Sequence, residues 1–332
     1  MTETTTIVDR GYDHLPLPYG WFAVATSNEI AVGDVKTLKY FGTEFVIWRG
    51  ENGQLNAVDP YCPHLGAHLG HGGEVVGDDL QCPFHHWSWN GQGGVTAIPY
   101  AKIIPPKLKR PECLKTWTLG ESMGVVYAWF HPRGTAPKWE LASDPDIIAQ
   151  NWVLAETHEW IIKIHIQEIS ENGQDYAHFR AVHGTQGPPA SEFKVDGVVR
   201  RNSVTTEMLT PRGPMTGNIS TYAVGPGQSF IRYTDVTDVF QAQMLTAIDA
   251  NHTHMRWQFF HPPDISDGKM RVTKARMRDL VKQVTQDIPI WEHKRYHPEP
   301  LLVEGDGPII AYRNQYARYY EYDDPKPTIV AA

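Results

Sequence analysis

Cysteine is scarce in this sequence, which contains Cys62, Cys82 and Cys113 among 332 residues. Three cysteines cannot form the even-numbered disulfide framework of a small secreted domain, and two of them stand close to histidines instead. We expect Cys113 to be a small buried residue. This use of cysteine favours a reducing compartment, so we expect a cytoplasmic protein.

Long apolar runs and clusters of basic residues are also missing. The longest strongly apolar run, "GVVYAWF" at 124–130, is far shorter than the ~20 residues of a transmembrane helix. The first residues have no basic flank followed by an apolar core, so we expect no signal peptide. A net charge of −8 without a lysine- or arginine-rich run argues against a nucleic-acid partner. We therefore expect no membrane span and no nucleic-acid binding.

The rest of the composition is that of a globular protein, with 41% hydrophobic and 20% charged residues and enough length for two domains. Short strand patterns fill the first part, where Asn52-Gly53 predicts a hairpin. Later segments mix strand and helix patterns. We predict an α+β protein, with an all-β domain over 18–135 and an α+β domain over 136–325.

Two patterns in the second domain bear on its chemistry. Residues 195–262 have strand patterning with β-branched and aromatic clusters. Residues 277–297, "MRDLVKQVTQDIPIWEHKRYH", have helical periodicity, and we expect Pro289 to interrupt that helix.

Cysteine and histidine form a paired motif in the first domain. Cys62 and His64 read C-x-H, and after 17 residues Cys82 and His85 read C-x-x-H. Structural zinc sites favour short C-x₂₋₄-C knuckles with a separate histidine pair, whereas each segment here supplies one sulfur and one nitrogen. That pattern is typical of a Rieske [2Fe–2S] centre, in which two cysteines bind one iron and two histidines the other. Zinc is the alternative.

Other histidines near this motif are assigned to its surroundings. We prefer His85 to the adjacent His86 as the ligand because the C-x-x-H gap places it at the loop tip. His68 and His71 are expected at the surface or behind the ligands. Trp87 and Trp89 are expected to shield the cluster from water.

A second metal site is indicated by "ENGQDYAHFRAVHG" at 171–184. His178 and His183 can face one point if the helix between them is slightly distorted, and Asp175 precedes them. Two imidazoles and one carboxylate on one face of Fe(II) leave open positions for dioxygen and substrate. The third ligand should be acidic.

Three acidic residues remain open as that ligand. They are Asp287, Asp279 and Glu292, and spacing alone does not choose among them.

The two cysteine segments, "CPHLGAHLGHGG" and "CPFHHWSWNGQG", resemble the Rieske domain of the Rieske non-heme iron oxygenases. That family carries D-x-x-H-x₄-H and a distant aspartate, which match Asp175, His178, His183 and Asp287. The resemblance implies that Asp287 is the third ligand of a mononuclear Fe(II). It also implies that Asp175 bridges this site to the Rieske histidine of a neighbouring subunit in a homotrimer.

The C-terminal text at 287–320 resembles the 3-ketosteroid 9α-hydroxylase oxygenase and cholesterol 7-desaturase branch of that family, through I-W-x-H-K, P-L-L-V-E-x-D-G-P and Y-x-x-Y-Y. The resemblance implies an O₂-dependent monooxygenase of steroid metabolism and lipid degradation. It further implies an antiparallel sheet covered by helices in the second domain. The electrons would come from NADH through a flavin or iron–sulfur reductase.

A steroid-like substrate needs an apolar cavity with a few polar groups. Six residues could line such a cavity or be ordinary core: Phe230, Tyr233, Phe240, Met244, Trp257 and Phe259. Two alternatives stay open for the function. One is desaturation or O-demethylation of another ring compound, and the other is a non-catalytic Rieske electron-transfer or redox-sensing protein. The sequence leaves the regiochemistry and the identity of the reductase undefined.

Overall fold

The structure is a computed structural model. It describes residues 10–12, 15–111, 113–184, 194–210, 213–234 and 238–322. The chain divides into two compact units, one formed by residues 21–143 and the other by residues 1–20 with 144–332. Among the helices that the structure describes, none has the length and apolar character that a membrane span requires.

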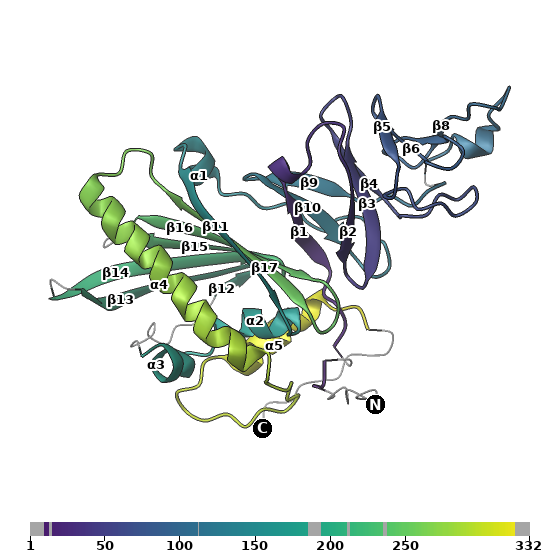
Figure 1. The fold of residues 1–332 in the computed structure, drawn as a ribbon. Helices are drawn as coiled ribbons and strands as arrows, with labels where there is room; N and C mark the ends of the chain where they lie inside the picture. Colours follow the sequence, from purple (N-terminus) through teal and green to yellow (C-terminus); the bar gives the residue numbers. More distant parts are fainter. Residues whose placement is uncertain are drawn as a thin grey trace, which may run out of the picture. The chain divides into compact units, whose positions relative to one another are not determined.

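The first unit is built from short strands in three small sheets (Figure 1). One sheet has the order β1-β10-β9, with β1 (Gly20–Thr26), β9 (Leu119–Ser122) and β10 (Val125–Phe130). The next has the order β2-β3-β4, with β2 (Val35–Tyr40), β3 (Thr43–Arg49) and β4 (Leu55–Val58). The third has the order β5-β6-β7-β8, with β5 (Glu74–Val76), β6 (Asp79–Gln81), β7 (Ser88–Trp89) and β8 (Val95–Ala97).

The expected hairpin forms between β3 and β4. The two strands pair antiparallel, with Arg49 opposite Leu55, and Gly53 in the connecting turn has a φ of 81°. Glycine adopts this left-handed conformation without the steric cost that a side chain would add. The hairpin therefore fixes β3, whose residues Val46 and Trp48 are fully buried and pack in one hydrophobic cluster with Cys62 and Cys82.

The second unit contains one seven-stranded antiparallel sheet with the order β11-β17-β16-β15-β14-β13-β12. Its strands are β11 (Val153–Ile162), β12 (Lys194–Asp196), β13 (Val199–Thr210), β14 (Gly213–Val224), β15 (Gln228–Thr234), β16 (Val239–Ala247) and β17 (Thr253–His261). The helices are α1 (Pro145–Ala149), α2 (Ile166–Asn172), α3 (Ala177–His183), α4 (Asp267–Trp291) and α5 (Ile309–Tyr316).

Helix α4 lies across one face of this sheet (Figure 1). Its buried residues recur at helical spacing, as Met277, Leu280, Val284, Asp287 and Trp291. Because side chains alternate across a strand, every second residue of the central strands faces the same side of the sheet. The space between that face and the helices is where the second site lies.

The expectation that Pro289 interrupts this helix is wrong. Helix α4 continues through Pro289 to Trp291, and the backbone N–H of Glu292 still bonds to the carbonyl of Ile288 at 2.9 Å. Proline removes one hydrogen bond of the helix and its ring crowds the carbonyl one turn earlier, and here both effects are confined to the last turns of α4. The helix therefore presents both Asp287 and Trp291 on one face, one turn apart.

Candidate metal centres and cavity

The two cysteine segments of the first unit form loops of the same design. In each loop the cysteine N–H bonds to the carbonyl five residues later, Cys62 to Ala67 at 2.9 Å and Cys82 to Trp87 at 2.8 Å. The cysteine carbonyl accepts from the N–H four residues later, which belongs to Gly66 in the first loop and to His86 in the second.

This correspondence explains the position of His86. Gly66 and His86 occupy equivalent loop positions, and both have left-handed backbone, with φ of 77° and 56°. The His86 ring is turned to Gln81, with Nδ1 2.8 Å from Oε1. His86 is therefore the residue that turns the loop, and His85 faces the other segment.

The two thiols of this motif are neighbours, and so are its two imidazole rings. Cys62 and Cys82 are both 2% exposed, and burial, reinforced by the neighbouring Cys82, raises the pKa of the Cys62 thiol to about 11. The rings of His64 and His85 have centroids 4.7 Å apart. A buried pair of protonated thiols is unreactive, and a metal would bind these two cysteines only as thiolates.

A ring nitrogen of His85 also indicates that this motif binds a metal. Across the described ranges, the buried Nδ1 of His85 has no hydrogen-bond partner. Such an atom is costly unless something binds it. Trp87 stacks on His64 at 4.4 Å and 11°, and its indole N–H donates to the Tyr100 hydroxyl. The donor set thus fits a [2Fe–2S] cluster with two sulfur and two nitrogen ligands.

The remaining residues near the motif have other contacts. His68 Nε2 lies 3.6 Å from a Glu44 carboxylate oxygen, and the His68 and His71 rings are 4.4 Å apart. Cys113 is only half-buried, and its Sγ lies 3.1 Å from the Lys107 carbonyl oxygen, so the expectation of a buried residue is wrong. A thiol at the edge of a connecting segment remains partly open to water.

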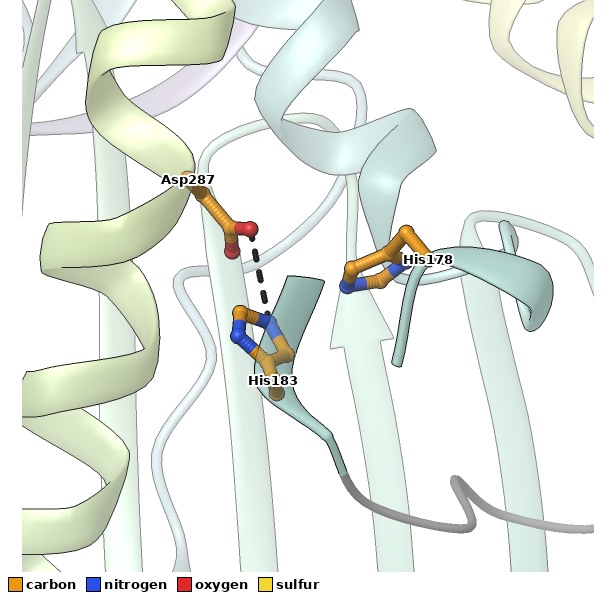
Figure 2. A group of neighbouring side chains, drawn as sticks. All are labelled: His178, His183 and Asp287. Atoms are coloured by element: carbon orange, nitrogen blue, oxygen red, sulfur yellow. Dashed lines mark ion pairs between the residues drawn. The ribbon is translucent and has the colours of Figure 1, made fainter. Parts of the chain in front are cut away.

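The second site joins α3 and α4. His178 is in the first turn of α3 and His183 is its last residue, after which Gly184 with a φ of 66° ends the helix. The two rings have centroids 5.1 Å apart. Asp287 on α4 completes a group whose ligand atoms all lie within 4.8 Å of one another (Figure 2).

The outer nitrogens of both imidazoles are engaged, which directs the inner ones to the site. His178 Nδ1 contacts the Asp175 carbonyl, and His183 Nδ1 lies 3.2 Å from Oε1 of Gln286. His183 Nε2 is 3.3 Å from Oδ1 of Asp287. Histidines that bind metals typically use the second ring nitrogen in this way.

Burial determines the protonation of these groups. Burial lowers the pKa of His178, which favours the neutral imidazole that a metal needs. Burial also raises the pKa of Asp287 to about 6, against the opposing effect of the nearby His183. A buried carboxylate beside two imidazoles fits a divalent cation such as Fe(II), whose charge offsets the loss of water.

The structure separates the three acidic candidates. Asp279 accepts from Arg276 at 3.2 Å and from Gln283 at 2.9 Å, and Glu292 accepts from the Lys163 N–H at 3.4 Å. Asp287 is the one that lies beside the histidines.

Asp175 lies at the rim of this site. Its carboxylate is 41% exposed, with Oδ2 3.9 Å from His178 Nδ1. Oδ1 accepts from the His178 N–H at 3.3 Å. The carboxylate thus contacts a candidate ligand while part of it stays accessible.

Sequence reasoning missed two residues of the site, Asn172 and Trp291. The Asn172 amide nitrogen lies 3.2 Å from His178 Nε2 and 3.4 Å from Oδ2 of Asp287. Trp291 donates its indole N–H to Oδ1 of Asn172 at 3.3 Å. A helical spacing of four between Asp287 and Trp291 is the only signal in the sequence, and a buried tryptophan at that spacing is usually core.

A cavity of about 270 Å³ opens beside the three candidate ligands, which form part of its wall. The sheet contributes rows of side chains from neighbouring strands, in which apolar residues flank polar ones. The polar residues include Arg200, Asn202, Thr221, Gln241 and Gln243. The apolar residues include Val204, Ile219, Ile231, Leu245 and Met255.

Two of the six aromatic or methionine candidates line this cavity, namely Tyr233 and Trp257. Phe230 and Phe240 are buried and flank a separate hollow that Arg232 and Asp144 also line. Met244 and Phe259 are buried core residues outside the cavity wall.

Comparison with known proteins identifies both parts of the chain. Residues 20–113 match the Rieske [2Fe-2S] domain, and residues 128–320 match the 3-Ketosteroid 9alpha-hydroxylase C-terminal domain. The 3-ketosteroid-9-alpha-monooxygenase oxygenase component of Rhodococcus rhodochrous is 30% identical over 351 residues, which cover 96% of this chain and 88% of that protein. Cholesterol 7-desaturase nvd 2 of Ciona intestinalis is 30% identical over 343 residues, covering 93% and 73%.

Solved structures share the fold at lower identity. NdmA of Pseudomonas putida CBB5 with caffeine matches with a TM-score of 0.72 and 18% identity, covering 92% of this chain and 97% of that chain. Dicamba monooxygenase bound to dicamba matches with a TM-score of 0.68 and 15% identity, covering 90% and 96%.

The chain therefore belongs to the Rieske non-heme iron oxygenases, with a C-terminal domain of the 3-ketosteroid 9α-hydroxylase type. The predicted fold class, an all-β Rieske domain followed by an α+β domain with an antiparallel sheet, is confirmed. The chain is the terminal oxygenase component of such a system, which implies a reductase partner and sets aside the non-catalytic alternative.

Proposed function

We propose that this protein hydroxylates a hydrophobic ring compound of steroid type with O₂. The catalytic domain, residues 136–325, would bind Fe(II) through His178, His183 and Asp287. The observation that carries this proposal is that all three side chains form part of the wall of the cavity. A substrate held there lies directly beside the ion.

The cavity has the composition that a steroid requires. Ring compounds with few oxygen functions bind through apolar walls and a small number of polar groups. Leu280 and Val284 of α4 face the apolar rows of the sheet, and Asn202, Thr221 and Gln241 can bond to substrate oxygens. The relatives named for 3-ketosteroid and cholesterol chemistry support the same class.

Each metal group supplies one kind of chemistry when bound. A Rieske cluster on Cys62, His64, Cys82 and His85, in the domain 18–135, supplies single electrons. Fe(II) on two imidazoles and one carboxylate has open positions for O₂ and substrate. The protein's own part is to orient the substrate and to exclude water through the walls of the cavity.

We propose NADH as the source of electrons, through a flavin or iron–sulfur reductase. We further propose a homotrimer in which Asp175 connects His178 to a Rieske histidine of the next subunit. The exposed part of the Asp175 carboxylate and its contact with His178 support this role. The scarcity of cysteine, with Cys62 and Cys82 assigned to the cluster and not to a disulfide, supports a cytoplasmic location.

The reaction is tested with 4-androstene-3,17-dione, NADH, O₂ and a reductase. We expect substrate-dependent oxygen uptake and a product that has gained one oxygen atom. Consumption of oxygen without any modified product across a panel of steroids would contradict the steroid assignment.

Desaturation is the second candidate, because cholesterol 7-desaturases are among the relatives at 28–30% identity. The same experiment separates the two reactions by product mass, since desaturation removes two hydrogens and adds no oxygen. Cholesterol is the substrate for that arm.

A further inference from the structure

Trp291 is the last residue of α4 and is 5% exposed. It follows Asp287 by four residues, so both side chains lie on one face of the helix. Its indole N–H donates to Oδ1 of Asn172 at 3.3 Å. An indole nitrogen is a donor only, so the atom of the amide that faces it has to be the oxygen.

The other end of the Asn172 amide is fixed by a second neighbour. Its nitrogen lies 3.4 Å from Oδ2 of Asp287 and 3.2 Å from Nε2 of His178. An ionised carboxylate only accepts, and so does the imidazole nitrogen that carries no proton. One amide orientation satisfies all three contacts, and reversing the amide would oppose two donors at Trp291 and two acceptors at Asp287. Hydrogen bonds to Trp291 and Asp287 therefore fix the orientation of the Asn172 amide.

The contacts of Asp287 with Asn172 and His183 distinguish its two carboxylate oxygens. Oδ2 accepts from the Asn172 amide, whereas Oδ1 lies 3.3 Å from His183 Nε2, on the side of the imidazoles. One oxygen is thus held by the protein and the other is presented to the site. The Asn172 oxygen accepts from Trp291.

We propose that Trp291 is a positioning residue that acts through Asn172, so that Asp287 binds the mononuclear iron through Oδ1 alone. This inference rests on the proposed function of the site. A carboxylate bound through one oxygen leaves one more coordination position open than a carboxylate bound through both. Asn172 then acts as a hydrogen-bond donor at the edge of the site and does not bind the metal.

The test uses Trp291→Phe, which keeps an aromatic ring and removes the N–H donor. Fe(II) is titrated into the protein after mild chelation, and nitric oxide is added as a probe whose complex with Fe(II) gives an electron paramagnetic resonance signal. We expect a changed and more heterogeneous signal and an Fe(II) affinity about 10-fold weaker, within the range for lost outer contacts of metal ligands. Unchanged Rieske and far-ultraviolet circular dichroism spectra report that the fold is retained.

Trp129→Phe is the matched control. Trp129 is also 5% exposed and donates its indole N–H to the Thr135 carbonyl at 2.8 Å, but it belongs to the unit formed by residues 21–143 and does not line the cavity. The control loses the same atoms and one hydrogen bond outside the second unit, so its nitric oxide signal should match the unchanged protein. A Trp291→Phe variant that behaves like Trp129→Phe overturns the inference.

Asn172→Leu separates an action through Asn172 from a general effect of packing. If Trp291 acts through the amide, the double variant Trp291→Phe, Asn172→Leu is no worse than Asn172→Leu alone. Effects that add fully would show that Trp291 acts independently and would refute the inference. Absence of any Fe(II) signal in the unchanged protein would instead refute the proposed function itself.

Discussion

His183 Nε2 and Oδ1 of Asp287 lie 3.3 Å apart, although the two residues come from different helices, α3 and α4. Their side chains are 2% and 9% exposed, so neither group is solvated as it would be at the surface. Burial raises the pKa of Asp287 to about 6, although His183 and the Asn172 amide partly oppose this shift. A cation between the two groups would favour the ionised carboxylate.

Replacing Asp287 by alanine should remove this cation. We expect Asp287→Ala to weaken Fe(II) binding by more than about 100-fold, beyond the range seen for outer contacts, because a direct ligand is lost. The Rieske visible and electron paramagnetic resonance spectra should persist. The measurement is the mononuclear iron content together with both spectra.

Asp279→Ala is the control for that experiment. Asp279 lies on the same helix with a side chain 46% exposed, and it pairs with Arg276. Its loss should leave the iron content unchanged, since exposed ion pairs contribute little. Retention of mononuclear iron and turnover by Asp287→Ala would remove Asp287 from the site.

The adjacent histidines of the first unit should respond differently to substitution. His85→Ala should abolish the Rieske signal, because His85 faces His64 and its buried Nδ1 has no other partner among the described residues. His86→Asn should retain the cluster, because asparagine tolerates the left-handed backbone that His86 adopts. Loss of the Rieske signal in both variants would contradict the assignment of His86 as the residue that turns the loop.

Asp175→Ala should separate metal binding from the passage of electrons. Its carboxylate contacts His178 without belonging to the three-ligand group, so both metal centres should remain. We expect product formation in a single turnover to slow, since the proposed hydrogen-bonded link between the two centres is lost. Rapid single-turnover product from this variant would refute the bridging role.

The sequence predicts those features of the protein whose residues lie close together along the chain. The spacing of Cys62, His64, Cys82 and His85 predicts the cluster ligands because each pair lies within one short loop. The hairpin at Asn52-Gly53 is predicted for the same reason. His86 could not be placed from spacing alone, since its role follows from the hydrogen bond to the Cys82 carbonyl.

Features that depend on tertiary packing were not accessible in the same way. Alternation along a strand divides residues between two faces, but the face that α4 covers is set by the fold. Tyr233 and Trp257 line the cavity, whereas Phe230 and Phe240, of similar character, point to the other side. Asn172 was missed because its partners, Asp287 and Trp291, come from a distant helix.

A buried histidine that binds no metal makes the stability of the second unit depend on pH. His165 is the N-cap of α2, and its Nδ1 accepts from the Gln167 N–H at 3.2 Å. Burial lowers its pKa to about 4, from about 6.5 in an unfolded chain. The unfolded state therefore binds more protons between these values, and stability falls as pH decreases from 6.5 to 4. The shift corresponds to about 3 kcal/mol when complete.

His165→Asn should remove this dependence, because asparagine caps a helix without titrating. We expect the free energy of unfolding of the unchanged protein, measured in urea at pH 7, 6, 5 and 4, to fall more steeply than that of the variant. His252→Asn is the control, since that side chain is 41% exposed. Protonation of His165 would also remove the acceptor that caps the start of α2. Parallel pH profiles for the unchanged protein and His165→Asn would show that His165 does not cause the loss of stability.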